Sequence, residues 1–278
     1  MKRVSLFDLT ETAPAESLQV EFFKDASLKC ILVKRVENTE ENLRKVVTKV
    51  VGKSKIVIMR PSSPTSKIVD LLYYIEGPEG VEEEIASEIE GLGIAEEVVI
   101  IDLPNEKLAL NVFFPILTLG ERSIILRERI YSGFFNGLRE RMGEGGAKAF
   151  LYLIGLNMGK KIAQSLHHLL GETDLIKCLK LLAFVGRAQG FFSIIEIEKG
   201  DDSISIDIRD NWEAACIAEK YRKKKPQCFW TKGVLKGILN ELTSEVWNIS
   251  ETRCVAAGDD ACRFTAKRSK GGENIIMP

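Results

Sequence analysis

The 278-residue sequence predicts an α+β protein built from two domains. Three observations lead to this prediction. Segments typical of strands and helices alternate in the first part of the chain, strongly helical patterns open the second part, and alternating segments typical of antiparallel hairpins follow them. Because a chain of this length forms one large or two medium domains, we place the domains at residues 1–110 and 111–278.

The N-terminal domain is predicted to contain six elements in the order strand, helix, strand, strand, helix, strand. Their ranges are residues 28–36, 39–51, 54–60, 67–76, 81–90 and 96–103. Asn38 or Thr39 is suited to cap the first helix, which has apolar residues on one face and ends at Gly52. This β-α-β-β-α-β order is that of the ferredoxin-like split motif.

The order of these elements over residues 25–104, together with the short connection between the second and third strands, resembles the ACT family of regulatory domains. Many ACT domains that bind amino acids have a glycine in the turn between the first strand and the first helix. This chain has Glu37-Asn38-Thr39 at that turn. We therefore expect an ACT-like module that packs or dimerises, with effector binding as the alternative.

The C-terminal domain is predicted to combine helices with an antiparallel sheet. The predicted helices span residues 122–142, 147–170, 174–185 and 229–242, and the predicted strand pairs are 191–198 with 203–208 and 245–251 with 261–267. The helix over 147–170 is apolar around much of its circumference, and Gly155 and Gly159 allow another helix to approach it closely. We expect the connector over 104–119, which has apolar residues of its own, to pack against the fold.

Composition favours an ordinary globular protein. The net charge is −1, which gives no global attraction to nucleic acid or to anionic membranes. No apolar stretch approaches the roughly 20 residues that span a bilayer, and the N-terminus lacks the features of a signal peptide. We therefore expect a cytoplasmic protein. Six cysteines are too sparse for a disulfide scaffold, and we expect Cys30, Cys178 and Cys216 to be simple buried thiols.

The residues most suited to bind a metal are Cys228, Glu251, Cys254 and Cys262. Zinc prefers four ligands in a tetrahedron and favours thiolates, completed by imidazole or carboxylate. Cys254 and Cys262 flank a Gly-Asp-Asp turn, and Cys228 opens a helix whose dipole stabilises a thiolate. A closed set of four ligands predicts a structural zinc ion. The spacing alone leaves open three unrelated cysteines, because it is not the close-paired CxxC pattern.

Several short motifs carry a second resemblance. They are Gly190-Phe-Phe, Asp210-Asn211 after a strand, Cys228 ahead of Gly233 and Gly237, Glu251-x-x-Cys254, and Gly258-Asp259-x-x-Cys262-x-Phe264. With these motifs, residues 186–267 resemble the 4-vinyl reductase domain, a hydrocarbon-binding family that includes bacterial aromatic-sensing regulators and is related to TRAPP vesicle-tethering subunits. The resemblance implies that three cysteines and a glutamate hold zinc beside a ligand pocket.

The predicted pocket differs from that of the aromatic sensors. Those proteins typically have a Gly-Trp-Gly step and a histidine that binds a phenolic hydroxyl, whereas this chain has Ala188-Gln189-Gly190. We therefore do not carry the phenol specificity over. The candidate ligand-binding residues are Phe184, Phe191, Phe192, Trp212, Phe229, Trp230, Trp247 and His167. The alternative for each aromatic residue is ordinary core packing.

Catalytic motifs are missing from the sequence. It has no GxGxxG after a strand, no GxxxxGK[ST], no GxSxG and no HExxH. His167 and His168 are its only histidines, so histidine acid-base chemistry is poorly supplied. We expect a non-enzymatic cytoplasmic sensor or carrier that binds an apolar or aromatic small molecule and signals through an unknown protein partner. The alternatives are a tetrapyrrole-handling or vinyl-reduction accessory protein and a non-catalytic scaffold.

A homodimer is the expected assembly, with no nucleic-acid or membrane partner. Helices that are apolar all round need burial on both sides, and closed two-fold dimers are the commonest soluble oligomers. The family members that this chain resembles commonly pair through their helical portions. The alternative is that the helix over 147–170 is simply central within one subunit.

Overall fold

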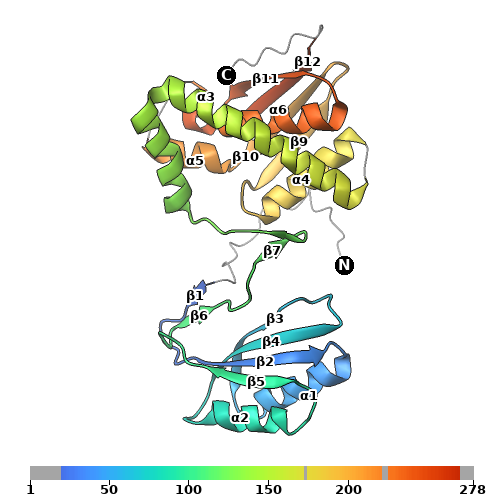
Figure 1. The fold of residues 1–278 in the computed structure, drawn as a ribbon. Helices are drawn as coiled ribbons and strands as arrows, with labels where there is room; N and C mark the ends of the chain where they lie inside the picture. The colour runs from blue at the N-terminus through green and yellow to red at the C-terminus, as the bar shows by residue number, and fades with distance from the viewer. Residues whose placement is uncertain (1–19, 172–173, 221–224, 270–278) are drawn as a thin grey trace, which may run out of the picture. The chain divides into compact units, whose positions relative to one another are not determined.

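The computed structural model describes residues 20–171, 174–220 and 225–269. The chain forms two compact units, which meet in the sequence at Ile124 and Ile125 (Figure 1). The connector continues past residue 110 into a small pair of strands, β7 (Leu117–Thr118) and β8 (Glu121–Arg122), before the helices begin. The prediction of a helix from residue 122 was therefore wrong at its start, because these residues pair as strands.

The N-terminal unit has the predicted order of elements. They are β2 (Lys29–Glu37), α1 (Glu40–Val51), β3 (Lys55–Pro61), β4 (Ile68–Glu76), α2 (Val81–Glu90) and β5 (Glu97–Ile101). The sheet order is β3-β4-β2-β5, and every neighbouring pair is antiparallel. Thr39 caps α1, and its hydroxyl accepts a hydrogen bond from the Asn42 amide at 3.3 Å. The split β-α-β-β-α-β prediction is confirmed.

Both faces of this sheet are covered. Helices α1 and α2 pack on one face through Val46, Val50, Ile85 and other apolar residues. On the other face lies a pair of short strands, β1 (Val20–Phe22) and β6 (Leu108–Leu110). The Tyr74 hydroxyl joins this pair to the sheet, because it donates to the Leu110 carbonyl at 2.6 Å and accepts from the Leu110 amide at 2.8 Å. The first part of the connector is thus packed, as expected.

The C-terminal unit combines helices with one antiparallel sheet. Its elements are α3 (Glu128–Leu170), α4 (Leu175–Ala188), β9 (Ile194–Lys199), β10 (Ser203–Arg209), α5 (Trp212–Lys220), α6 (Phe229–Thr243), β11 (Trp247–Arg253) and β12 (Cys262–Arg268). The sheet order is β11-β12-β10-β9, which confirms both predicted strand pairs. Helix α5 was not predicted. Its start depends on Asn211, whose side-chain oxygen accepts from the Glu213 amide at 3.0 Å.

Helix α3 is broken at Gly143. This glycine has φ 69° and ψ 174°, which lies outside the helical region. Residues 128–142 therefore form a separate first segment, which we call the α3 arm, and the long segment that follows contains Gly155 and Gly159. The break agrees with the prediction of two helices here, because glycine adopts such a conformation at little steric cost.

The long segment of α3 and helix α6 lie side by side with their backbones in contact (Figure 1). A Cβ atom on Gly155 would lie 2.3 Å from the Trp230 carbonyl oxygen, and one on Gly159 would lie 2.1 Å from that of Val234. Gly233 and Gly237 of α6 make the matching approach to α3. The helix that approaches the glycine pair of α3 is therefore α6 of the same chain, and this pair gives no support to a second copy.

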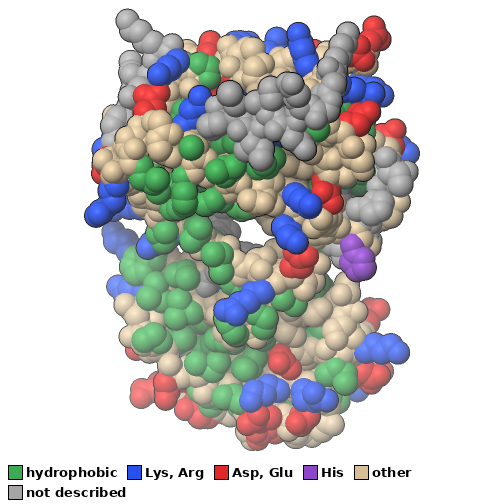
Figure 2. All heavy atoms as spheres, turned by 45° about the horizontal axis from the view of Figure 1, so that its top comes forward, with side chains coloured by type: hydrophobic (Ala, Val, Ile, Leu, Met, Phe, Trp, Pro, Cys, Tyr) green, Lys and Arg blue, Asp and Glu red, His purple; other side chains and the backbone are tan. Residues whose placement is uncertain are grey.

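The surface carries charge of both signs. On the face shown in Figure 2, acidic and basic side chains are interspersed and hydrophobic side chains gather between them. This mixture agrees with the net charge of −1. Within the described ranges, no helix combines the length and apolar character that crossing a bilayer requires.

Candidate metal centre

Three cysteines and one glutamate meet at one end of the C-terminal sheet. Cys228 caps the N-terminus of α6, Glu251 lies near the end of β11, Cys254 follows that strand, and Cys262 begins β12. The Cys228 sulfur lies 3.6 Å from the sulfur of Cys254 and 3.6 Å from that of Cys262. The four potential ligand atoms all lie within 4.8 Å of one another, and the three cysteines are buried.

The turn between Cys254 and Cys262 is built from the Gly-Asp-Asp segment that the sequence singled out. A 3₁₀ helix, Val255–Ala257, ends at Gly258, whose φ of 106° favours glycine. The Asp259 carboxylate accepts from the Cys254 amide at 2.8 Å, and the Val255 amide lies 3.5 Å from the Cys262 sulfur as a donor. These contacts return the chain so that both sulfurs face the same point.

The donor set fits a tetrahedral zinc ion. Zinc–sulfur bonds of about 2.3 Å place two thiolates of a tetrahedral site roughly 3.8 Å apart. The two sulfur–sulfur distances of 3.6 Å are close to that value and far longer than the roughly 2 Å of a disulfide. One carboxylate oxygen of Glu251, Oε1, is buried without a hydrogen-bond partner among the described residues. This orphaned oxygen is suited to be the fourth ligand, so the four residues could hold a metal ion.

The four groups must lose their protons to bind a cation. Burial raises the pKa of the Cys228 thiol, and burial raises the pKa of the Glu251 carboxyl to about 9. Hydrogen bonds from the thiols of Cys228 and Cys262 lower the pKa of Cys254. A divalent cation would replace the remaining protons, as metal ions do at thiolate sites.

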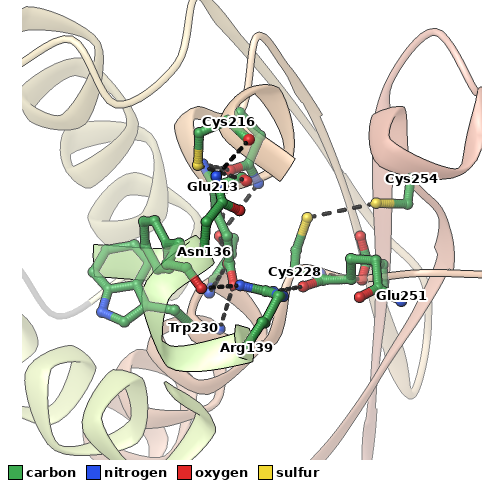
Figure 3. A network of polar contacts seen from close by, with 12 residues as sticks. Asn136, Arg139, Glu213, Cys216, Cys228, Trp230, Glu251 and Cys254 are labelled. Atoms are coloured by element: carbon green, nitrogen blue, oxygen red, sulfur yellow. Dashed lines mark hydrogen bonds and ion pairs between the residues drawn. The ribbon is translucent and has the colours of Figure 1, made fainter. Parts of the chain in front are cut away.

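A second layer of buried polar groups holds the segment that carries Cys228 (Figure 3). The Glu251 Oε2 atom accepts from the Cys228 amide at 2.9 Å. The Glu213 carboxylate from α5 accepts from the amides of Trp230 and Thr231 at 3.0 and 2.9 Å, and from the Thr231 hydroxyl at 2.9 Å. Two carboxylates from other elements therefore satisfy the free amides at the N-terminus of α6.

Glu213 is completely buried, and its nearest cation is Arg139 of the α3 arm. The Arg139 Nη2 atom lies 3.8 Å from Glu213 Oε1 and donates to the Gln227 carbonyl at 3.0 Å. Burial raises the pKa of Glu213 to about 7, while the donors on Trp230 and Thr231 and the charge of Arg139 oppose this rise. Arg139, Glu213 and Gln227 could not be identified from the sequence, because isolated polar residues give no spacing signal.

The candidate ligand-binding residues separate into two groups. Phe191, Trp212 and Trp230 contact one another, with ring centroids 5.0 to 6.2 Å apart. Tyr131 and Phe135 of the α3 arm join them, each 5.0 Å from the Trp212 ring; the sequence analysis did not single out these two residues. The Trp212 Nε1 atom is buried without a hydrogen-bond partner among the described residues.

The other candidates belong to the core or lie outside the description. Phe192 packs against Gly186, where an added Cβ would lie 2.5 Å from the ring. Trp247 is buried at the start of β11, and its Nε1 donates to the Thr243 hydroxyl at 2.9 Å. Phe229 is buried beneath Arg139, whose guanidinium lies 5.4 Å from the ring centroid, and Phe184 is half-buried. The side chain of His167 lies outside the described residues.

Part of the C-terminal unit matches a known protein family. Residues 208–268 match the V4R domain, the 4-vinyl reductase family to which the motifs pointed, and this range includes all four candidate metal ligands. An uncharacterized protein of Methanocaldococcus jannaschii is 30% identical over 80 residues, which is 28% of this chain. The matched segment is 33% of that relative's length, so the chain spans only about a third of the curated relative that it matches.

The C-terminal unit is also similar to solved structures. The phenol-responsive sensory domain of the transcription activator PoxR, solved with phenol, has 17% identity and a TM-score of 0.47, with 54% of this chain and 78% of that chain covered. A vinyl-4-reductase family protein from Methanocaldococcus jannaschii has 23% identity and a TM-score of 0.37, with 55% and 87% covered.

Proposed function

We propose that the C-terminal unit, which carries a V4R domain, is a small-molecule-binding sensory module whose fold is held together by zinc. The single observation that supports zinc most strongly is the cluster of Cys228, Glu251, Cys254 and Cys262. Thiolates are soft ligands that favour zinc over magnesium or calcium, and four protein ligands leave no open position for catalysis. We therefore propose a structural ion and a non-enzymatic role.

The proposed ligand is an apolar or aromatic small molecule with one hydrogen-bond acceptor. The PoxR domain carries phenol in its solved structure, and ligand sites are mostly apolar with a few polar groups that orient the ligand. In this chain the unpartnered Trp212 Nε1 would supply such a donor, among the rings of Tyr131, Phe135 and Phe191. These rings pack against one another, so we propose that they separate when the ligand binds.

Ligand binding is expected to change the tryptophan fluorescence of the protein, because Trp212, Trp230 and Trp247 are its only tryptophans. Titration with phenol, indole and naphthalene as probes measures the change. We expect Trp212→Phe to weaken the affinity for the probe, read from the titration, at least tenfold. Trp247→Phe is the matched control, because Trp247 already has a hydrogen-bond partner in Thr243. Absence of any response, together with no small molecule in native mass spectra, would favour the scaffold alternative.

The N-terminal unit is proposed to be an ACT-like packing or dimerisation module. Its support is the ferredoxin-like strand order β3-β4-β2-β5. Both sheet faces are covered, so the edges and the outer helix surfaces remain for contacts with another subunit.

The protein is proposed to be a homodimer that pairs through the long segment of α3. Phe150 and Leu153 of this segment are 39% and 43% exposed despite being large and apolar. Sedimentation over a wide concentration range is expected to show a species of twice 31.1 kDa. Leu153→Glu is expected to dissociate it, whereas Met59→Glu, on the edge strand β3, is not. A 31 kDa species at all concentrations would reject the dimer, and dissociation by Met59→Glu alone would move the interface to the N-terminal unit.

A further inference from the structure

The α3 arm is attached to the rest of the C-terminal unit by both apolar and polar side chains: Tyr131 and Phe135 pack against Trp212, and polar groups bond to other segments. Its buried side chains within the described range are Phe135, Asn136 and Arg139. Asn136 Nδ2 donates to the Cys216 carbonyl at 3.3 Å, and Arg139 Nη2 donates to the Gln227 carbonyl at 3.0 Å. The arm thus places two of its three buried side chains on backbone carbonyls of other segments.

The polar part of this attachment is only weakly stabilising. A typical hydrogen bond adds about 1 kcal/mol net, because each group gives up its bonds to water. Asn136 Oδ1 and Arg139 Nε are buried without a hydrogen-bond partner in the described part of the chain, which costs further free energy. The break at Gly143 separates the arm's backbone from the long segment. Across this break, the arm is joined to the rest of the unit by side-chain contacts.

Arg139 also contacts the segment that carries the first metal ligand (Figure 3). Its acceptor, the Gln227 carbonyl, belongs to the residue immediately before Cys228. On the other side of that peptide bond, the Cys228 amide donates to Glu251, another candidate ligand. Gln227 is fully buried, so its carbonyl has no water to replace Arg139. A change in the position of Cys228 therefore moves the acceptor of Arg139.

Glu213 completes the connection. It lies 3.8 Å from Arg139 and holds the amides of Trp230 and Thr231 in the first turn of α6. Its charge is completely buried, and a buried charge that loses its partner is strongly destabilising. Arg139 consequently serves two buried acceptors, the Gln227 carbonyl and the Glu213 carboxylate.

We propose that Arg139 is a positioning residue for the metal centre and that it makes the docking of the α3 arm depend on metal occupancy. The inference rests on the proposed function, because it requires a metal at the four ligands. When Cys228 is held as a ligand, the Gln227 carbonyl stays within reach of Arg139. When Cys228 is released, Arg139 loses that acceptor and the arm loses one of its polar attachments.

This dependence identifies the element that would carry the output of the unit. The arm directly follows the division between the two units at Ile124 and Ile125. Its outer face carries Ile130 and Phe134, which are 52% and 46% exposed. An arm that opens would thus change the apolar surface available to a partner.

Hydrogen exchange of the full chain, followed by mass spectrometry, tests the proposal. We expect amides of residues 128–142 to exchange at least tenfold faster after zinc is removed with a chelator. Arg139→Met is expected to show the same fast exchange of these amides even with zinc bound. Its zinc affinity, measured by competition with a chelator, is expected to be about tenfold lower than that of the wild-type protein. Arg141→Met is the matched control, because Arg141 lies on the same arm but is exposed. The amides of β10 distinguish local from global opening, because they exchange faster only if the whole unit unfolds.

Cobalt substitution separates positioning of the metal from general stability. Arg139→Lys keeps a positive charge near Glu213, but its one nitrogen cannot occupy both positions from which Nη1 and Nη2 donate to Phe135 and Gln227. We expect it to shift the visible absorption bands of bound cobalt, and Arg141→Lys to leave them unchanged. Zinc-loaded Arg139 variants with wild-type exchange in the arm and wild-type cobalt spectra would overturn the inference while leaving the metal proposal intact. A wild-type chain that binds no zinc would overturn both.

Discussion

Replacing Cys254 or Cys262 by serine is expected to abolish zinc binding and to destabilise the C-terminal unit. Elemental analysis of the wild-type protein should give about one zinc per chain, and each variant should give none. Loss of a structural metal is among the few single changes that cost about 4 kcal/mol or more, because metal binding is coupled to folding. For a unit of this size, that cost corresponds to a decrease in Tm of roughly 10 °C.

The matched control for this experiment is Cys30→Ser. Cys30 is also a buried thiol, but it lies in the N-terminal unit on strand β2, outside the ligand cluster. The Cys30→Ser variant should retain the full zinc content, whatever the substitution does to the stability of the N-terminal unit. Wild-type protein that contains no metal when freshly purified, or a Cys254→Ser variant with unchanged metal content, would contradict the assignment of the site.

Replacing Gly159 by alanine is expected to destabilise the C-terminal unit by about 3 kcal/mol, and Gly155→Ala by a similar amount. An added Cβ would lie 2.1 Å from the Val234 carbonyl oxygen or 2.3 Å from that of Trp230, whereas real Cβ contacts essentially never fall below 3.0 Å. Since both contacts are to backbone atoms of α6, no side-chain rotation can relieve them. The two helices must move apart along their whole contact.

Urea unfolding followed by tryptophan fluorescence measures this effect, because all three tryptophans belong to the C-terminal unit. Gly137→Ala is the matched control. It lies in the arm of the same helix with no atom within 4 Å of an added Cβ, and alanine there should stabilise the protein by up to about 1 kcal/mol. Equal stabilities for Gly159→Ala and Gly137→Ala would show that the two helices do not approach as closely as described.

The elements of both units could largely be predicted from local patterns in the sequence. Apolar residues at helical spacing, a Thr39 cap and glycine breaks predicted α1 and α2 closely, and alternation predicted the hairpin of β9 and β10. Strands β1 and β6 could not be found in this way. Each has only three residues, which is too short to show a pattern of alternation. The two strands also pair with each other from opposite ends of the N-terminal unit's sequence.

The candidate metal ligands were also accessible from the sequence, because cysteine is rare and its spacing around a Gly-Asp-Asp turn is informative. The residues that support them were not. Arg139 looks like a solvated charge on a predicted helix, Glu213 falls outside every predicted element, and Gln227 lies two residues after the Lys-rich run Arg222–Lys225. Burial alone makes these residues important, and burial at this site is created by α3, α5 and α6 together.

The sequence by itself thus determined the α+β class, the split motif of the N-terminal unit, and the four residues that could hold a metal. These depend on short-range properties: periodicity, capping and ligand chemistry. Only the tertiary structure decided which helix approaches Gly155 and Gly159, which aromatic side chains surround Trp212, and which charge faces Glu213. These depend on contacts between segments distant in the chain, where a residue's role is set by the neighbours that folding brings to it and by the water that folding removes.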